Sequence, residues 1–451
     1  MSESRTDLAT IFALSSGRGR AGVAVIRIAG PRAGVVVDRM AAPRPKPRYA
    51  AFRRVKHPDS GQILDEALVL WLPGPRTETG EDMAELQVHG GAAVIRAVLG
   101  AIVCIAGCRP AEPGEFAQRA FHNGRLDLTA AEGLADLIDA ETEAQRRQAL
   151  VQAGGGLARL YDGWRERLLA ARGLAEAAID FSDETDVAAD ALAGARREAE
   201  MLLAEVEAHL ADGHRGEIVR DGFRVVLAGP PNVGKSSLLN ALTRRDVAIV
   251  SPEAGTTRDV LEVRLDLGGY AVVLTDTAGI RDAEGAIEAE GIRRTLERAR
   301  DADLVLWLVD AASIGPARPV DLQTIDAPIL VVANKADLIG EKSKSEIPVN
   351  AILVSAVSGA GLAELIARLA AEVSAKSGGG DAPPVLSQER HRLGLSQGRD
   401  ALRRILLDAD LGAELQAEEL RLAADALGRV VGRVDVEDVL GQIFGRFCIG
   451  K

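Results

Sequence analysis

The stretch GPPNVGKSS, Gly229 to Ser237, decides the fold of the middle of the chain. It matches the pattern GxxxxGK[ST], in which backbone amides and a lysine cradle phosphates between a strand and a helix. The apolar run FRVVLAG leads into the pattern as the strand, and SSLLNAL follows Lys235 as the helix. The sequence therefore predicts a phosphate-binding loop in an α/β domain.

Four further motifs follow in the order that a guanine-nucleotide site requires. They are GTT at 255–257, DTAG at 276–279, NKAD at 334–337 and Ser355-Ala356. Asp337 can accept hydrogen bonds from both donors on the guanine edge, whereas adenine would leave this carboxylate unpaired. A site built this way can reject the wrong base by roughly 10⁴-fold. The five elements together predict a GTP-binding P-loop domain of the Ras-like class.

The residue types at this site have chemical reasons. Lys235 reaches the β and γ phosphates, and the Ser236 hydroxyl is a magnesium ligand. Thr257 can complete the magnesium shell of a triphosphate, so residues 251–259 are the leading candidate for a loop that orders and disorders with hydrolysis. The predicted GTP contacts are Asn232, Val233, Gly234, Lys235, Ser236, Ser237, Ser251, Thr256, Thr257, Asp276, Thr277, Ala278, Gly279, Asn334, Lys335, Asp337, Ser355 and Ala356.

Ile280 follows DTAG, where many small GTPases have a glutamine that orients the attacking water. Isoleucine cannot hydrogen-bond water, so the catalytic polar group must come from elsewhere. The candidates are the carboxylates of the stretch RDAEGAIEAEGIRR, which are Asp282, Glu284, Glu288 and Glu290. The alternative is that this stretch is only a solvated loop and helix face.

The sequence also shows no obvious local arginine finger, whose absence would forfeit roughly 10³ to 10⁵ in rate. A monovalent cation beside the phosphates is one way to supply the missing positive charge. Asn232 and the carbonyls of the 251–256 loop are hard oxygen ligands suited to such a cation.

The chain resembles the MnmE family, also called TrmE, of tRNA wobble-uridine modification GTPases, from near Leu8 to Lys451. The most specific marks are FCIGK at 447–451, AEPGEFAQRAFHNGRLDL at 111–128, GEDMAELQVHGG at 80–91, and GTTRD with DTAGIR. The resemblance implies a potassium-stimulated GTPase whose G domains dimerise across their nucleotides. It selects Glu288 as the residue that positions water. It also implies potassium ligands at Asn232, Ser251, Glu253 (through its backbone carbonyl) and Thr256.

The same resemblance implies that the amino-terminal region binds a tetrahydrofolate derivative, 5-formyl or 5,10-methylene, and builds a constitutive homodimer. The folate contacts would fall on Arg27, Glu85, Arg125 and Lys451. Carboxylates of the folate suit Arg and Lys, and a pterin donor edge suits Glu85. Without the resemblance, Arg27 and Arg125 would be interpreted as surface ion-pair partners.

Cys448 in the FCIGK tail has two interpretations. On general grounds it is a small buried apolar residue at a helix end. The resemblance implies instead that it lies near the folate site and is needed for modification. We hypothesise that Cys448 acts in or near the one-carbon transfer step.

The chain divides by composition into three kinds of region. Residues 1–121 mix strands such as VAVIRIA and EALVLWL with short helices, an α+β pattern, and 219–374 hold the GTPase motifs. Residues 122–218 and 375–451 are helical, and a TAAE capping box at Thr129 to Glu132 is expected to open the first part. One helical domain with an inserted G domain is more economical than two separate helical domains, since each flank would otherwise have to bury its apolar face alone.

Charge and composition limit the partners. The net charge of −12 argues against general polyanion binding, so any tRNA contact must be local. The stretch PRPKPRYAAFRRVKH, 43–57, carries six Lys or Arg and is either such a patch or a solvated proline-rich loop. Three cysteines exclude a disulfide framework and indicate a reducing compartment. No apolar run approaches the ~20 residues of a membrane helix. We therefore expect a soluble cytoplasmic protein with no membrane contact.

The resemblance implies a GTP hydrolase that works with an FAD-containing partner, MnmG (GidA), in a heterotetramer. Together they would add an aminomethyl or carboxymethylaminomethyl group to C5 of the wobble uridine of certain tRNAs. A rival hypothesis is a ribosome-assembly GTPase of the Era or Der type, which would not need FCIGK or the folate-like module. A third is a folate-dependent one-carbon enzyme regulated by GTP.

Overall fold

The computed structural model describes residues 9–17, 19–245, 247–249, 262–276, 300–312, 327–339, 348, 350–378, 385–408, 410–434, 437–447 and 449–450. The chain forms two compact units. Unit 1 comprises Met1–Ala135, Ala153–Leu169 and Ala424–Lys451, and unit 2 comprises Asp136–Gln152 and Ala170–Ala423.

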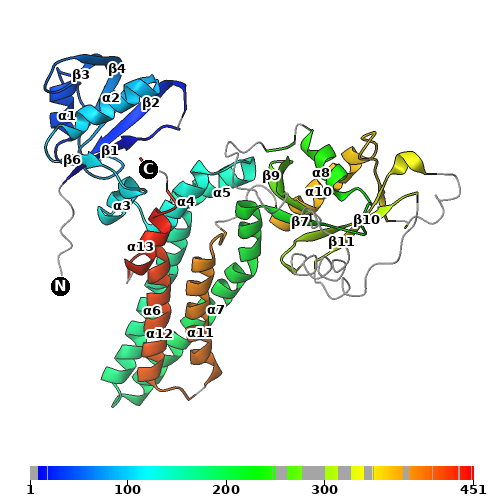
Figure 1. Ribbon diagram of the computed structural model, residues 1–451. Coiled ribbons are helices and arrows are strands. Elements are labelled where there is room, and N and C mark those ends of the chain that lie inside the picture. The colour runs from blue at the N-terminus through cyan, green and yellow to red at the C-terminus, as the bar shows by residue number, and fades with distance from the viewer. Residues whose placement is uncertain are drawn as a thin grey trace, which may run out of the picture. The chain divides into compact units, whose positions relative to one another are not determined.

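A six-stranded mixed sheet organises the amino-terminal part of unit 1 (Figure 1). Its order is β3-β4-β5-β2-β1-β6, and all neighbours are antiparallel except β1 and β6. The strands are β1 (Thr10–Leu14), β2 (Ala21–Ala29), β3 (Ala51–Lys56), β4 (Ile63–Leu72), β5 (Met83–Gly90) and β6 (Cys108–Pro110). The predicted strands VAVIRIA and EALVLWL lie within β2 and β4.

Two helices, α1 (Ala33–Met40) and α2 (Ala92–Val103), pack on one face of this sheet. Side chains alternate along a strand, so Ala24, Ile26 and Ile28 of β2 all reach the core that the helices cover. Arg27 lies between them in the sequence and therefore points to the other face, as does its register partner Glu85. The predicted α+β class of this region is confirmed.

The carboxy-terminal segment completes a second core of unit 1. Helix α13 (Glu437–Phe444) packs with α3 (Glu115–His122) and the start of α4 (Leu128–Ile138). The predicted TAAE capping box is wrong in detail. The helix begins at Leu128, and Asp127 caps it by accepting from the Ala130 N–H at 2.9 Å and the Thr129 hydroxyl at 2.6 Å. Asp127 lies two residues closer to the helix start, so it reaches the free backbone donors first.

The GTPase motifs lie on a second six-stranded sheet, in unit 2, of order β12-β11-β10-β7-β9-β8. All neighbours are parallel except β8 and β9, which form an antiparallel hairpin. The strands are β7 (Phe223–Ala228), β8 (Glu262–Leu267), β9 (Tyr270–Asp276), β10 (Leu304–Asp310), β11 (Ile329–Asn334) and β12 (Ile352–Leu353). The phosphate-binding loop follows β7, where the strand order reverses. Ligands of open α/β sheets bind at such a point.

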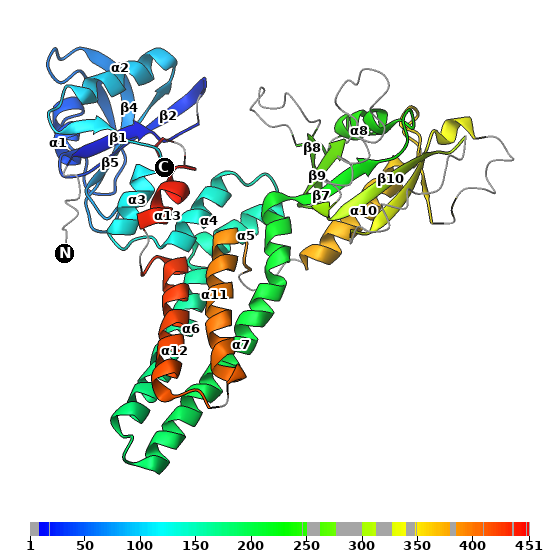
Figure 2. The same ribbon diagram turned by 60° about the horizontal axis from the view of Figure 1, so that its bottom comes forward.

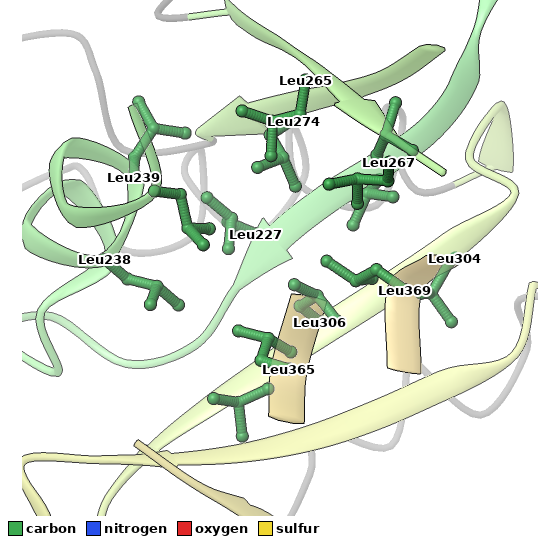
Figure 3. Packing of buried hydrophobic residues seen from close by; sticks show 14 of the residues in the cluster. Leu227, Leu238, Leu239, Leu265, Leu267, Leu274, Leu304, Leu306, Leu365 and Leu369 are labelled. Atoms are coloured by element: carbon green, nitrogen blue, oxygen red, sulfur yellow. The ribbon is translucent and has the colours of Figure 1, made fainter. Parts of the chain in front are cut away.

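A leucine-rich core fixes the helices of this domain against the sheet. Helix α8 (Lys235–Thr243) contributes Leu238 and Leu239, and α10 (Leu362–Ser377) contributes Leu365 and Leu369 (Figure 3). Both helices bury apolar side chains three and four residues apart, the spacing of one helical face. This packing holds the first turn of α8 at the end of β7, directly after the phosphate-binding loop.

Five further α-helices lie in the described part of the chain. They are α5 (Glu143–Ala153), α6 (Gly156–Asp180), α7 (Thr185–Asp221), α11 (Glu389–Leu407) and α12 (Ala413–Val431). Helices α7 and α11 lie side by side within unit 2 (Figure 2). Gly154 and Gly155 separate α5 from α6, and residues 181–184 separate α6 from α7. Within the described ranges, no helix is long and apolar enough to cross a bilayer.

Candidate functional site

Two glycines let the phosphate-binding loop approach its neighbours. Gly229 has φ 148°, and a Cβ there would lie 2.4 Å from the Leu308 carbonyl oxygen. Gly234 has φ 91°, and a Cβ there would lie 2.4 Å from the Asn334 amide nitrogen. Any larger residue would push the loop away from β10 and β11, so the two glycines of the motif serve backbone packing as well as phosphate access.

Lys235 is held under this loop. It is 8 % exposed, and its Nζ donates to the carbonyl oxygens of Gly229 at 2.9 Å and Pro230 at 3.0 Å. Burial lowers the pKa of Lys235, an effect partly opposed by the Asp276 carboxylate. A buried ammonium that donates to carbonyl oxygens gains from an incoming anion, so the geometry suits a phosphate.

Ser236 begins the first full turn of α8 and faces the end of β9. Its hydroxyl donates to Asp276 Oδ2 at 2.8 Å. Asp276 is 1 % exposed while Ser236 is exposed, so the pair joins a buried carboxylate to a hydroxyl open to solvent. A hydroxyl backed by a carboxylate is a hard oxygen pair that suits magnesium.

The predicted base-recognition residues lie together at the ends of β11 and β12. Asn334 Nδ2 donates to the Val233 carbonyl at 2.9 Å, and its Oδ1 accepts from the Ala356 N–H at 3.2 Å. The Ser355 hydroxyl donates to Asp337, whose side chain is exposed. The structure therefore brings NKAD and Ser355-Ala356 to one place and joins them to the phosphate-binding loop through Asn334.

The sequence analysis did not single out Asp310, which ends β10. Its Oδ2 lies 2.6 Å from Lys335 Nζ, and Lys335 has a left-handed φ of 64°. The ion pair holds this strained turn between β11 and the short helix η2 (Ala336–Leu338). An aspartate at the carboxyl end of the buried strand LVLWLVD was the available signal.

Unit 1 holds a second polar cluster around Arg27. This guanidinium lies 2.5 Å from Glu78 and 3.4 Å from Glu85, and it lies 5.9 Å from the centre of the Phe116 ring. Its side chain is 15 % exposed. Glu85 was predicted as the partner of a ligand, and Glu78 was missed because its loop cannot be placed from sequence.

Arg125 and the chain end approach the same part of unit 1. Arg125 lies against Gly80, where a Cβ would meet the Arg125 Cγ at 3.3 Å, in the loop that carries Glu78. The Ser15 hydroxyl donates to the Gly450 carbonyl at 2.8 Å, and Ile449 bridges to Pro113. The residue next to Gly450 in the sequence, Lys451, lies outside the described residues, as does Cys448.

Comparison with known proteins covers the whole chain. A family model described as the MnmE helical domain matches residues 128–448, and one described as the GTP-binding protein TrmE N-terminus matches residues 10–125. The tRNA modification GTPase MnmE of Methylorubrum populi is 54% identical over 444 residues, which cover 98% of both chains. The MnmE of Azorhizobium caulinodans is 52% identical over 442 residues, which cover 98% of this chain and 99% of that protein. The chain belongs to the MnmE family.

Membership in the MnmE family makes the chain a GTPase and confirms the family predicted from the sequence. A crystal structure of Era from Aquifex aeolicus bound to GDP·AlF₄⁻ is 26% identical, with a TM-score of 0.27, and the match covers 40% of this chain and 66% of that chain.

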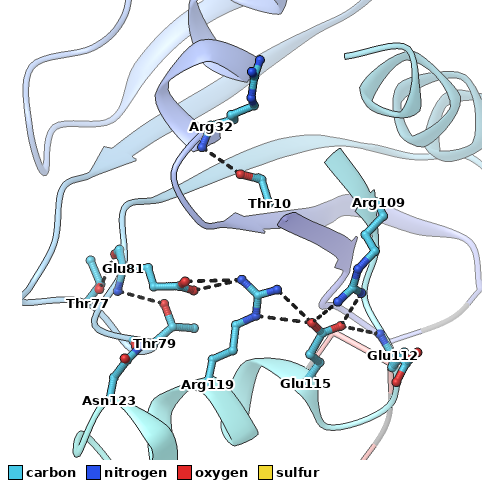
Figure 4. A network of polar contacts seen from close by, with 10 residues as sticks. All are labelled: Thr10, Arg32, Thr77, Thr79, Glu81, Arg109, Glu112, Glu115, Arg119 and Asn123. Carbon is cyan, nitrogen blue, oxygen red and sulfur yellow. Dashed lines mark hydrogen bonds and ion pairs between the residues drawn. The ribbon is translucent and has the colours of Figure 1, made fainter. Parts of the chain in front are cut away.

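A buried ion-pair network supports the MnmE-family motif AEPGEFAQRAFHNG (Figure 4). Glu115 accepts from Arg109 at 2.7 and 2.8 Å and from Arg119 at 2.9 Å, and Arg119 also contacts Glu81 at 3.3 Å. Burial alone would raise the pKa of Glu115. Hydrogen bonds from Arg109, the Glu112 backbone N–H and Arg119 outweigh it and lower the pKa.

Other predicted MnmE-family site residues lie outside the part of the chain that the structure describes. They are Ser251, Glu253, Thr256, Thr257, Thr277, Ala278, Gly279 and Glu288. Asn232 is described. It is exposed, with a left-handed φ of 63° that asparagine tolerates better than most residues.

Proposed function

We propose that this GTPase drives the modification of C5 of the wobble uridine in tRNA. It adds an aminomethyl or carboxymethylaminomethyl group, together with an FAD-containing partner of the MnmG (GidA) type and a tetrahydrofolate one-carbon unit. The observation that carries the proposal is the joining of the phosphate-binding loop, Asp276 of DTAG, NKAD and Ser355-Ala356 into one site, within a chain of which 98% matches an MnmE relative.

The described residues fit GTP and magnesium. Lys235 and the backbone of the Gly229–Gly234 loop would hold the phosphates, and Asp337 would hold the guanine edge. Ser236, with Thr257, would hold Mg²⁺, which supplies charge neutralisation at the phosphates. The Ser236–Asp276 hydrogen bond is the observation behind this fit, because a magnesium-ligating hydroxyl needs an oriented partner.

Potassium is proposed as the second cation. Its ligands would be the Asn232 side chain and the loop positions Ser251, Glu253 and Thr256. Asn232 lies within the phosphate-binding loop, with a left-handed backbone, and it is exposed. Glu288 is proposed to orient the attacking water, since Ile280 cannot.

The Arg27 cluster fits a folate. Arg27 Nε is buried without a hydrogen-bond partner among the described residues, while the guanidinium positions two carboxylates, Glu78 and Glu85. Such carboxylates can accept from the amino and N–H donors of a pterin. Arg125 and Lys451 would bind the folate's glutamate carboxylates. When bound, the folate supplies a one-carbon unit. Cys448 is proposed to act in or near its transfer.

The assembly and the domain limits are also part of the proposal. Residues 1–121 would bind folate and form the homodimer, 219–374 would be the G domain, and 122–218 with 375–451 would form the helical domain. The homodimer would join two partner subunits in a heterotetramer in the cytoplasm. Closure of the G domains on GTP would then reach the modification site through the helical domain.

The test measures GTP hydrolysis in matched potassium and sodium buffers, for the wild type, Glu288→Ala and the control Glu290→Ala. We expect a strong potassium preference, with the Glu288 variant binding GTP but losing most hydrolysis and the Glu290 variant retaining it. A deletion strain complemented with each variant reports wobble-uridine modification. Equal rates in both salts, or normal modification by an inactive Glu288 variant, contradict the proposal.

A further inference from the structure

Positively charged side chains cluster along one edge of unit 1. The 19 residues from Arg39 to His57 contain seven Lys or Arg and no Asp or Glu, although the whole chain has a net charge of −12. They form the end of α1, a proline-rich loop and the strand β3. We call this surface the basic edge. Its charged members are Arg39, Arg44, Lys46, Arg48, Arg53, Arg54 and Lys56.

Three of these cations are neutralised by carboxylates from elsewhere in unit 1. Arg39 pairs with Asp59 at 2.7 Å, Arg54 with Glu66 at 2.9 Å, and Arg44 with Asp38. The remaining four make no ion pair within the described ranges: Lys46, Arg48, Arg53 and Lys56. The basic edge therefore keeps a net positive charge after its internal pairs are counted.

The placement of the basic edge suits an extended partner. Strand β3 is the first strand in the sheet order, and β4 is its neighbour there. Phe52, Arg54 and Lys56 alternate onto the exposed side of β3, where neighbouring outward side chains stand about 6.6 Å apart. Residues of α1 and β3 line a hollow of about 420 Å³. Phe52 is 62% exposed and can stack on an unpaired base.

We infer that the basic edge binds the phosphate backbone of tRNA. This inference rests on the proposed function, which makes tRNA the substrate. Charge complementarity favours RNA over a second copy of the chain, because a two-fold interface places the same patch against itself and would bring like charges together. It corresponds to the first of the two interpretations of residues 43–57, the local patch.

The test uses the full chain and a tRNA transcript with uridine at the wobble position. Lys46→Ala/Lys56→Ala removes two unpaired cations, and Arg403→Ala/Arg421→Ala is the control with the same change in net charge. Arg403 is exposed and pairs with Glu207, and Arg421 is half-buried and pairs with Glu418. Binding is measured at several potassium concentrations, so that the dependence of log affinity on log salt gives the number of phosphate contacts.

We expect the Lys46/Lys56 variant to bind more weakly and to lower the salt slope by about 1.5 to 2, roughly one for each lost phosphate contact. The loss should be the same for a transcript without wobble uridine, because backbone contacts are independent of sequence. The control variant should keep the wild-type slope, and both variants should hydrolyse GTP at the wild-type rate.

Other outcomes separate the two proposals. If the wild type binds tRNA and the Lys46/Lys56 variant binds it with an unchanged slope, the basic edge is not the contact and the inference is overturned. If the Lys46/Lys56 variant is a monomer while the wild type is a dimer, the basic edge is a self-association surface. This outcome also overturns the inference. If the wild type itself does not bind tRNA, the proposed function fails as well.

Discussion

The hydroxyl of Ser236 and the carboxylate of Asp276 are joined by a 2.8 Å hydrogen bond between the first turn of α8 and the end of β9. Asp276 is buried and Ser236 is exposed, so a buried carboxylate fixes the orientation of the Ser236 hydroxyl, which belongs to a solvent-exposed residue. The pair also connects the phosphate-binding loop with the strand that leads into DTAG. The proposed magnesium site is thus tied to both halves of the nucleotide site.

Asp276→Asn should weaken magnesium-dependent hydrolysis by roughly 10- to 100-fold, the usual effect of losing a partner that orients a metal ligand. Neutralising the carboxylate removes negative charge from behind the Ser236 hydroxyl, so the magnesium concentration for half-maximal activity should rise. A magnesium titration of the hydrolysis rate measures both. Asp301→Asn, at an exposed position, is the matched control. An unchanged magnesium midpoint in Asp276→Asn would contradict this assignment.

Asp337→Asn should exchange guanine selectivity for xanthine selectivity. The carboxylate accepts from two guanine donors, whereas an amide presents one acceptor and one donor group, which matches the carbonyl that xanthine has in place of the guanine amino group. GTP affinity should fall by up to roughly 10⁴-fold while XTP affinity rises.

Competition of GTP and XTP for a fluorescent nucleotide measures this exchange. Ser355→Ala is the comparison, because it removes only the hydroxyl that donates to Asp337 and should cause a smaller loss of GTP with no gain of XTP. If Asp337→Asn still prefers GTP to XTP, Asp337 is not the residue that recognises the base.

The nucleotide site was predictable because its motifs are local. The strand FRVVLAG, the helix SSLLNAL and the strand before NKAD are each specified by a short apolar pattern, and their order in the chain implies a parallel sheet. Gly229 and Gly234 could be assigned to the loop from spacing alone.

The contacts made by long-range pairing could not be predicted in this way. Glu78 reaches Arg27 only because the loop between β4 and β5 folds back over β2, and nothing in the sequence of that loop fixes its path. Asp310 pairs with Lys335 because β10 and β11 are neighbours in register. The Asp127 cap was missed because TAAE fits the capping pattern equally well, and only the packed helix shows which residue comes first.

Glu115→Gln should destabilise unit 1 at pH 7 by roughly 3 kcal/mol, since it replaces the buried carboxylate that Arg109 and Arg119 share with a neutral amide. The folded-state pKa of Glu115 is below its ordinary value of 4.5. A lowered carboxylate pKa adds stability above the unfolded-state value, and this stability is lost as the pH falls through the folded-state pKa. The difference between wild type and variant should therefore keep its full size from pH 7 to about pH 5 and shrink as the pH falls below 4.5 toward the lower folded-state pKa.

Urea denaturation followed by Trp71 fluorescence measures this, with Trp164→Phe and Trp307→Phe in both chains so that Trp71 is the reporter for unit 1. Glu112→Gln is the control, because Glu112 contributes only its backbone N–H to the network and its side chain is exposed. A difference that stays constant from pH 5 to pH 3 would show that Glu115 is not the group that titrates.

The last prediction concerns the contact of the β8–β9 hairpin with the start of α5, both in unit 2. Arg264 of β8 lies 3.1 Å from Glu141, and the Ala144 N–H donates to the Gly269 carbonyl at 2.9 Å. The hairpin joins the chain after GTT to the chain before DTAG, so a movement of either motif would be transmitted through it to α5. The ion pair is partly exposed and should add under about 1 kcal/mol to stability. Loss of this ion pair should therefore leave the protein folded.

Arg264→Glu should leave GTP hydrolysis near the wild-type rate while lowering the amount of modified uridine formed per GTP hydrolysed. The swapped pair Arg264→Glu/Glu141→Arg should restore this ratio, because it rebuilds the attraction with the charges reversed. Phosphate release and nucleoside analysis of the tRNA, made on the same reaction with the FAD-containing partner, give the two quantities. If this contact couples hydrolysis to modification, the single variant forms less modified uridine per GTP hydrolysed and the swapped pair restores the ratio. If both variants keep the wild-type ratio, or both lose it equally, the hairpin does not carry the signal through Arg264 and Glu141.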